Sequence, residues 1–403
     1  MAKLLYLVHR LPYPPDKGDK VRSYHLLRHL AGKHEVYLGT FIDDANDAVH
    51  IPTLRSLCAG LHVARLGPRG ARLRSLAGLA RGEALTLHYY RNAALATWVR
   101  DTVATQHIDT AVVFSSSMAQ YVEHLPGMRM LVDFVDVDSA KWGQYAAHHA
   151  WPLSWLYRRE GQRLLACERR VAANAQRSFF VTDAETAMFR SLAPECAARV
   201  EPMCNGVDAA FFSPDPARPS PFAPNEIPLV FTGAMDYWPN VDAVTWFARD
   251  VLPGLLQQWP ALRFHIVGRS PTAAVQALAS AAVNVTGTVP DVRPHVQHAA
   301  VVVAPLRLAR GIQNKVLEAM AMARPVVLTE ACAKPIDARD GIELLCATDA
   351  ASFARRITEL LAAPARAAAI GQAGRQRALE RYTWSAHLAG IDRHLTEPLA
   401  LCA

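Results

Sequence analysis

Residues 301–330, VVVAPLRLARGIQNKVLEAMAMARPVVLTE, read as a strand, a helix and a second strand. The apolar runs Val301–Ala304 and Pro325–Leu328 have the length and β-branched content of buried parallel strands. Between them, Gln313–Ala323 predicts an amphipathic helix. Its polar side carries Asn314, Lys315 and Glu318. A strand-helix-strand unit of this kind indicates a doubly wound α/β fold.

The turn from the first strand into this helix has the composition of an anion site. Gly311 lies at the turn and Arg310 flanks it. The exposed amides of a helix N-terminus and the helix dipole favour a phosphate, to which Arg310 or Lys315 would add charge. Glu318, one turn further, could accept hydrogen bonds from ribose hydroxyls. The stretch suits a sugar nucleotide, although Lys315 and Glu318 could equally form a solvated i,i+3 pair on an ordinary connecting helix.

Length and composition indicate a two-domain globular protein. The chain has 403 residues, of which 51% are hydrophobic and 20% charged, enough apolar residues for two cores. Seven scattered cysteines without a CxxC motif support neither a disulfide framework nor a zinc site, and they favour a reducing cytosol. No apolar run has the length of a signal peptide core or a membrane span.

The net charge of +7 favours anionic partners such as nucleotides or acidic lipid headgroups. No nucleic-acid-binding motif is present, so nucleic acid is not an expected partner.

The first residues predict the opening strand, loop and helix of a doubly wound sheet. A strand at Lys3–Val8 is followed by a Pro/Gly-containing loop and a helix at Val21–Ala31. Gly18 permits close backbone approach to a ligand, and Asp19 can cap the helix. Gly18 could also be an ordinary turn glycine. The absence of GxGxxG disfavours a nicotinamide or flavin dehydrogenase.

Two later segments of this domain are basic and partly apolar. Residues 42–100 predict helices and loops at the domain rim, and residues 151–173 predict a long helix with tryptophans near its start. Their arginines fit a solvated face, and an acidic membrane surface is the alternative.

The segment VDFVDVDSAKW carries candidate catalytic carboxylates. Asp136 and Asp138 follow the strand Met130–Val135. Carboxylates at a strand's carboxyl end lie where open α/β sheets bind ligands, and these could bind sugar hydroxyls or take a proton from an acceptor. Asp138 or Ser139 could instead cap the following helix. No histidine is spaced to complete a metal site.

A proline-dense segment divides the chain. The boundary is expected in Val200–Asp215, where the turn pair Asn205-Gly206 leads into a proline-dense segment, after which the alternation of strands and helices restarts. We expect a domain at 1–203, a second at 204–384 and a terminal helix at 385–403 that could cross back to the first domain. Two such domains would leave a cleft between the carboxyl ends of their strands. Further strands are expected at His34–Thr40, Asp109–Phe114, Ser178–Thr182, Leu229–Thr232, Arg263–Val267 and Val283–Thr286.

Several ordered motifs resemble those of the retaining glycosyltransferase family 4, whose architecture, GT-B, has two facing Rossmann-like domains. They are the early PPxxxGD loop, PMCNGVDAAFF at 202–212, FTG at 231–233, GTVPDV at 287–292, KVLEAMAMARPVV at 315–327 and RYTW at 381–384. FTGAMDYWPN and VDFVDVDSAKW are most similar to a bacterial subgroup found beside exosortase and exopolysaccharide genes.

The sequence departs from this family at two places. The family usually has a Glu eight residues before the position of Glu318, where this chain has Arg310. The family also commonly has an Arg and a Lys after the FTG strand, where this chain reads AMDYWPN. Arg310 and Lys315, with Arg269, could supply the missing positive charge.

The resemblance implies roles for individual residues. Glu318 would bind ribose, Gly18 would lie near the diphosphate and Gly311 near the donor sugar. The donor-binding set expected here is completed by Asp19, Gly233, Asn240, Arg269, Arg310, Asn314 and Lys315.

The implied reaction is transfer of a hexose-like unit from a UDP- or GDP-sugar to a glycan or lipid-linked acceptor, with retention and without a metal or other cofactor. The expected location is cytoplasmic or peripheral on the inner face of the plasma membrane. A GT-B nucleotide-sugar epimerase and a non-catalytic nucleotide-sugar-binding scaffold are the alternatives.

Overall fold

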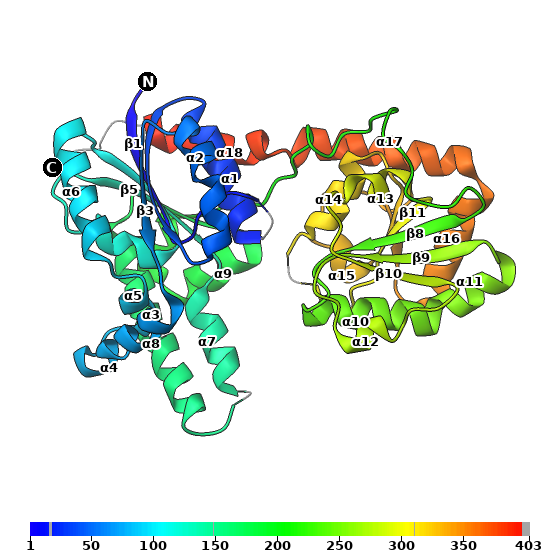
Figure 1. Cartoon of the computed structure of the whole chain (residues 1–403), viewed down its shortest axis with the longest axis horizontal. Helices are drawn as coiled ribbons and strands as arrows, with labels where there is room; N and C mark the ends of the chain where they lie inside the picture. The colour runs from blue at the N-terminus through cyan, green and yellow to red at the C-terminus, as the bar shows by residue number, and fades with distance from the viewer. Residues whose placement is uncertain (16–17, 148, 310, 397–403) are drawn as a thin grey trace. The chain divides into compact units, whose positions relative to one another are not determined.

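The computed structural model describes residues 1–15, 18–147, 149–309 and 311–396. Contacts divide the chain into two compact units. Unit 1 contains Met1–Cys204 together with the chain from Leu388 onward, and unit 2 contains Asn205–His387. Helices lie on both faces of the sheet in each unit (Figure 1).

Among the described residues, unit 1 has one seven-stranded parallel sheet. Its strands are β1 (Lys3–Val8), β2 (Glu35–Ile42), β3 (Gly60–Arg65), β4 (Thr110–Phe114), β5 (Arg129–Val135), β6 (Arg177–Phe180) and β7 (Val200–Pro202). Its helices are α1 (Gly18–Ala31), α2 (Ile51–Leu57), α3 (Pro68–Ser75), α4 (Ala77–Arg81), α5 (Leu85–Tyr89), α6 (Ala93–Gln106), α7 (Asp138–Ala147), α8 (Leu153–Asn174) and α9 (Asp183–Leu192). Short 3₁₀ segments lie at Ala45–His50, Ser116–Tyr121 and Pro194–Arg199.

The strand order of unit 1 is β3-β2-β1-β4-β5-β6-β7. Successive connections reverse direction between β1 and β4, where Leu5 is opposite Ala111. The central strands are buried on both sides, which is why β1 and β4 read as continuous apolar runs. In a doubly wound sheet the reversal point is where ligands bind, beyond the carboxyl ends of the strands.

Unit 2 has a six-stranded parallel sheet in the order β10-β9-β8-β11-β12-β13. The strands are β8 (Ile227–Thr232), β9 (Leu262–Val267), β10 (Val283–Gly287), β11 (Val301–Ala304), β12 (Val326–Thr329) and β13 (Leu345–Ala347). The helices are α10 (Trp238–Trp246), α11 (Leu252–Gln258), α12 (Ala273–Gln276), α13 (Arg293–His298), α14 (Asn314–Ala321), α15 (Glu330–Ala333), α16 (Ala350–Ala362) and α17 (Pro364–Arg381). A π-helical turn at Phe247–Val251 joins α10 to α11.

The predicted unit at 301–330 is confirmed as β11, α14 and β12. The apolar side of α14 is fully buried at Val316, Leu317 and Met320. Its polar side, with Lys315 and Glu318, is only partly buried. The two-unit, doubly wound α/β fold class is therefore confirmed, and the expected cleft between the domains stays a prediction.

The prediction for residues 42–100 was wrong at one place, because Gly60–Arg65 forms strand β3 rather than a loop. This edge strand is mostly half-buried, so its sequence GLHVAR lacks the continuous apolar run of an interior strand. The short strand β13, which pairs with β12, was not predicted either.

The last described helix, α18 (Trp384–Thr396), begins in unit 2 and ends in unit 1. Asp392 accepts hydrogen bonds from His29 Nε2 at 2.8 Å and Lys33 Nζ at 2.6 Å, both near the end of α1. Leu388 and Ile391 are fully buried. Residues 388–396 thus belong to the packed structure of unit 1.

Within the described residues, no helix combines the length and the apolar character needed to cross a lipid bilayer.

Helix α17 passes close to the end of α14 at Gly371, and we predict that Gly371→Ala destabilises unit 2. A Cβ at this position would lie 2.3 Å from the carbonyl oxygen of Ala323, so the two backbones would have to separate. Overpacking of this kind costs about 1–3 kcal/mol, measurable as a lower midpoint of urea denaturation. The control is Gly254→Ala in α11, where a Cβ meets no atom within 4 Å. Equal stability of the two variants would contradict the packing argument.

Candidate functional site

The turns after β8 and β9 approach each other closely at the carboxyl edge of the unit 2 sheet. A Cβ on Gly268 would lie only 1.7 Å from the carbonyl oxygen of Gly233, so position 268 must be glycine. A Cβ on Gly233 would lie 2.7 Å from the Asn240 side-chain nitrogen and 3.2 Å from Lys315 Nζ. Three predicted donor-binding residues, Gly233, Asn240 and Lys315, therefore meet at one point beside the reversal between β8 and β11.

The Lys315 ammonium group, in the first turn of α14, is held by two neighbours. Its Nζ donates a 2.6 Å hydrogen bond to Asn240 Oδ1 and lies 4.2 Å from the centroid of the Phe231 ring. Asn240 is itself oriented by a 2.9 Å hydrogen bond from its Nδ2 to the carbonyl oxygen of Ala234. Burial lowers the pKa of Lys315 to about 8, which Glu318 partly opposes. The ammonium group is fixed in position, and burial disfavours its protonated form. A bound anion would stabilise that form.

Glu318 lies one turn further along α14. The two side chains form no ion pair with each other, because the Lys315 ammonium is bonded to Asn240 instead. Among the described residues, no hydrogen-bond donor or cation pairs with the Glu318 carboxylate. Burial raises its pKa to about 7, against the opposing charge of Lys315. The carboxylate thus retains its full capacity to accept hydrogen bonds from a ligand.

The other candidate donor-binding residues of unit 2 are held by fewer contacts than Lys315 and Asn240. Arg269 follows Gly268, and its side chain is exposed while its carbonyl oxygen accepts a hydrogen bond from the Met235 amide. Gly311 has a φ of +63°, in the region that favours glycine, and precedes the first helical residue, Asn314. Arg310 lies outside the described residues.

In unit 1, Asp19 belongs to an ionic network at the carboxyl ends of β1 and β2. Arg10 Nη1 donates to Asp19 at 2.7 Å and Arg10 Nε to Asp43 at 3.1 Å, and His9 Nε2 lies 3.6 Å from Asp19. Burial alone would raise the pKa of Asp19, but His9 and Arg10 together hold it well below its usual value. Asp19 is therefore occupied by protein cations. The space beside Gly18 is open, since a Cβ there would meet nothing within 4 Å.

The candidate catalytic residues Asp136 and Asp138 share one partner. Lys141 Nζ donates to Asp136 at 2.8 Å and to Asp138 at 2.9 Å. The preceding residue, Val135, has a φ of +70°, which is strained for a β-branched side chain. The structure thus brings the two carboxylates together at the carboxyl end of β5 and partly exposed.

The amide of Ser139, in the first turn of α7, is bound by a side chain of another helix and not by the side chain of Asp138 or Ser139. Glu168 of α8 accepts hydrogen bonds from the Ser139 amide at 3.2 Å and from its hydroxyl at 2.5 Å. Burial raises the pKa of Glu168 to about 8, although the bonds from Ser139 oppose the shift.

His9, Arg10 and Glu168 were not predicted as members of these clusters. The pair His9-Arg10 had a detectable signal, because it directly follows the first strand. Glu168 had none, since its contact with Ser139 depends on the pairing of α7 with α8.

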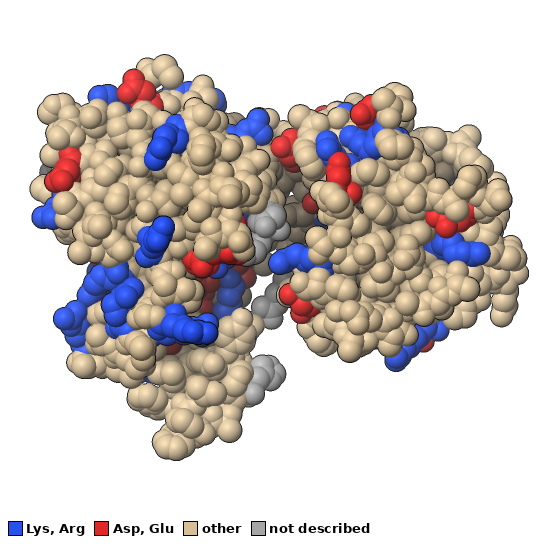
Figure 2. Space-filling view, viewed as in Figure 1, with Lys and Arg blue, Asp and Glu red and all other residues tan. Residues whose placement is uncertain are grey.

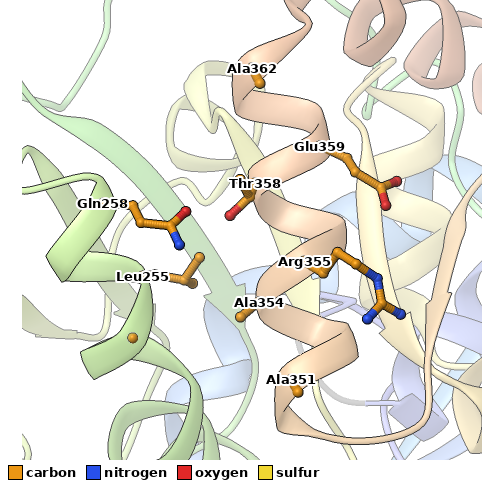
Figure 3. Close-up of a pocket in the computed structure, with 9 residues that line it drawn as sticks. Leu255, Gln258, Ala351, Ala354, Arg355, Thr358, Glu359 and Ala362 are labelled. Carbon is orange, nitrogen blue, oxygen red and sulfur yellow. The ribbon is translucent and has the colours of Figure 1, made fainter.

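One pocket lies away from all these residues. It is formed between α11 and α16, with Leu255 and Gln258 on one side and Ala354, Arg355 and Thr358 on the other (Figure 3). None of the predicted donor-binding residues lines it. Its walls offer mainly aliphatic surface, so we do not assign the predicted chemistry to it. No group of three or more His, Cys, Asp or Glu side chains suited to a metal ion is found in the described parts of the chain.

Comparison with protein families matches residues 226–363 to the family described as "Glycosyl transferases group 1". The matched segment lies within unit 2 and contains Gly233, Asn240, Lys315 and Glu318. No curated protein sequence matches the chain.

Comparison with solved structures finds the same fold along 98% of the chain. The Anabaena protein Alr3699/HepE in complex with UDP has a TM-score of 0.68 at 15% identity, and the match covers 100% of that chain. The same protein in complex with UDP-glucose has a TM-score of 0.67 at 15% identity, again covering 100% of that chain. Sucrose-phosphate synthase (tll1590) from Thermosynechococcus elongatus has a TM-score of 0.68 at 17% identity, covering 98% of that chain. The two parallel-sheet units match the GT-B fold.

The low pKa of Lys315 predicts a pH-dependent affinity for a simple anion such as pyrophosphate. The ammonium is present below about pH 8 and is lost above it. Pyrophosphate affinity, measured by isothermal titration calorimetry, should therefore fall between pH 7 and pH 9 in the unmodified protein. Lys315→Arg is the matched control, because a guanidinium keeps its charge throughout this range. Parallel pH profiles in the two proteins would contradict the assignment of Lys315 as the anion-binding cation.

Proposed function

We propose that this protein is a glycosyltransferase that moves a sugar from a nucleoside diphosphate sugar to an acceptor hydroxyl. The observation that carries the proposal is the cluster of Lys315, Asn240 and Glu318 at the carboxyl edge of the unit 2 sheet. It offers a held cation and, one helical turn away, a carboxylate that has no partner among the described residues. The group 1 match over this segment supports the proposal, as do the UDP and UDP-glucose bound to the Anabaena protein.

Each predicted residue of unit 2 has a role in this assignment. Lys315 and the first-turn amides of α14 bind the diphosphate, to which Arg269 and Arg310 add charge. Glu318 accepts hydrogen bonds from the ribose hydroxyls. Gly311 lies beside the donor sugar, and Gly233 leaves room for Asn240 to hold the Lys315 ammonium. In unit 1, the family resemblance assigns Gly18 and Asp19 to donor binding, and Asp19 holds the Arg10 guanidinium by a 2.7 Å hydrogen bond.

The chemical step follows from where charge develops. As the glycosidic bond to the diphosphate breaks, negative charge grows on the leaving phosphate oxygen. Fixed cations and oriented amides stabilise that charge, and the reaction then needs no metal ion. Asp136 or Asp138 takes the proton from the acceptor hydroxyl. The sugar is transferred with retention of its anomeric configuration, and no enzyme nucleophile takes part.

More specifically, we assign the protein to the retaining glycosyltransferase family 4, with a UDP- or GDP-hexose as donor. It would act in exopolysaccharide or glycolipid assembly in bacteria. Its location would be the cytoplasm or the inner face of the plasma membrane. The motifs FTGAMDYWPN and VDFVDVDSAKW support this assignment. Two alternatives predict different products. A nucleotide-sugar epimerase would act on the donor without an acceptor. A scaffold, which Arg310 at the usual Glu position favours, would bind the donor without turnover.

Nucleotide binding tests the site directly. Isothermal titration with UDP, GDP and ADP should give selective binding of one nucleotide. Lys315→Ala and Glu318→Ala should each lower the affinity about 10- to 100-fold, since hydrogen bonds to charged groups contribute about 1.5–3 kcal/mol. Arg249→Ala, an exposed charge on the same unit, is the control.

A ribose-modified ligand separates the two roles. Glu318→Ala should weaken the selected nucleoside diphosphate but not its 2′,3′-dideoxy form, whereas Lys315→Ala should weaken both. No binding of any nucleotide would refute the proposed site. Binding without turnover of any donor and acceptor pair would favour the scaffold.

If Asp136 or Asp138 is the general base, its removal should lower kcat and leave donor affinity unchanged. Either Asp136→Asn or Asp138→Asn should lower kcat by about 10²- to 10⁴-fold, the usual contribution of a general base, without changing donor affinity. The two variants are compared with each other, because both carboxylates share Lys141 and only one is expected to take the proton. Asp101→Asn, an exposed carboxylate on α6, is the control. Unchanged kcat in both Asp136 and Asp138 variants would remove these residues from the mechanism.

A further inference from the structure

Exposed apolar side chains gather on two segments of unit 1 that have no role in the proposed chemistry. Seven of the 16 exposed large hydrophobic residues in the described chain lie between residues 73 and 79 or between residues 145 and 155. Trp151, two residues before α8, is 80% exposed, and Trp155 in the first turn of α8 is 52% exposed. Leu73, Leu76 and Leu79, spaced three residues apart along α3 and α4, are exposed as well. Tryptophan at such exposure is unusual for a surface that contacts only water.

The same segments carry exposed arginines. Within the described ranges, no carboxylate pairs with Arg69, Arg72, Arg74, Arg81 or Arg158, all of which are exposed. No acidic residue occurs between Leu66 and Gly82. Figure 2 shows Lys and Arg gathered where α3 and α4 lie, whereas the end of the α7–α8 hairpin shows no charged side chain on this face.

Contacts of Arg159 bring the two segments together. Its guanidinium on α8 donates to the carbonyl oxygens of Gly78 at 2.9 Å and Glu83 at 3.1 Å, at the two ends of α4. Trp155 lies four residues before Arg159 and so shares the side of α8 that faces α4. We call the surface made by Leu73, Leu76, Leu79, Trp151, Trp155 and the five unpaired arginines the Arg–Trp face.

We propose that the Arg–Trp face docks on a lipid bilayer surface that contains anionic phospholipid. Indole rings are favoured at the boundary between headgroups and acyl chains, where Trp151 and Trp155 would lie. The leucines would add apolar area, and the arginines would meet lipid phosphates. Charge complementarity selects this occupant, because the five arginines would repel each other across an interface between two copies of the chain.

Vesicle co-sedimentation with the full chain tests the proposal. Vesicles of phosphatidylcholine with 30% phosphatidylglycerol should bind the protein, and vesicles of phosphatidylcholine alone should bind it much less. Arg72→Ala combined with Arg74→Ala should weaken binding roughly 25-fold, since each arginine near an anionic surface contributes about a fivefold factor. Trp151→Ala combined with Trp155→Ala should also weaken binding, and raising the salt concentration should weaken binding of the unmodified protein.

Matched variants on unit 2 control for each change. Tyr237→Ala with Trp238→Ala removes an equally exposed aromatic pair, and Arg249→Ala with Arg355→Ala removes two exposed charges. Both should bind vesicles normally. Absence of vesicle binding at low salt, or equal binding by all variants, would overturn the proposal. So would dimerisation in sedimentation velocity that is lost with Trp151 and Trp155, because the face would then be an interface between copies. Binding needs no nucleotide, so the result does not depend on the donor site.

Discussion

Parallel pairing of the strands is the constraint on which the rest of the structure depends. A parallel strand can be joined to the next only through a crossover, so every connection carries a helix or a long loop over one face of a sheet. Both faces are then covered, and interior strands such as Val301–Ala304 are apolar at every position. The same pairing places all carboxyl ends at one edge, where the turns after β8 and β9 must pass each other. The glycines at 233 and 268 follow from that crowding, and Lys315 Nζ lies beside them.

At the carboxyl edges of the two sheets, the charged side chains differ in how they are paired. In unit 1, Asp19, Asp43, Asp136 and Asp138 each accept a hydrogen bond from a protein cation. In unit 2, Lys315 is held by a neutral amide and an aromatic ring, and burial opposes its charge. Glu318 is likewise raised in pKa by burial. A ligand that is anionic at one end and rich in hydroxyl groups at the other would offset both costs, because the anion would pair with the Lys315 ammonium and the hydroxyl groups would donate to the Glu318 carboxylate.

Local sequence pattern predicted most of the fold and some of the residues that cluster at the candidate site. The strands at Lys3–Val8 and Val301–Ala304 agree at both ends because their residues are buried on both faces. Strand β3 could not be recognised in this way, since this edge strand is half-buried along most of its length and lacks a continuous apolar run. Lys315 and Glu318 were predicted from helical spacing, but the bond from Lys315 to Asn240 joins residues 75 positions apart. No periodicity in a single sequence encodes such a contact, nor the one between Ser139 and Glu168.

The return of the chain end to unit 1 affects the order in which the protein can fold during synthesis. Unit 1 is begun first but is complete only when residues 388–396 have left the ribosome, after all of unit 2. Until then, the surface that covers Leu388, Ile391 and Leu395 is open, and His29 and Lys33 lack Asp392. Unit 1 therefore cannot complete its folding while unit 2 is still being synthesised. The two units mature together, and a truncation near the C-terminus would damage the domain that contains the N-terminus.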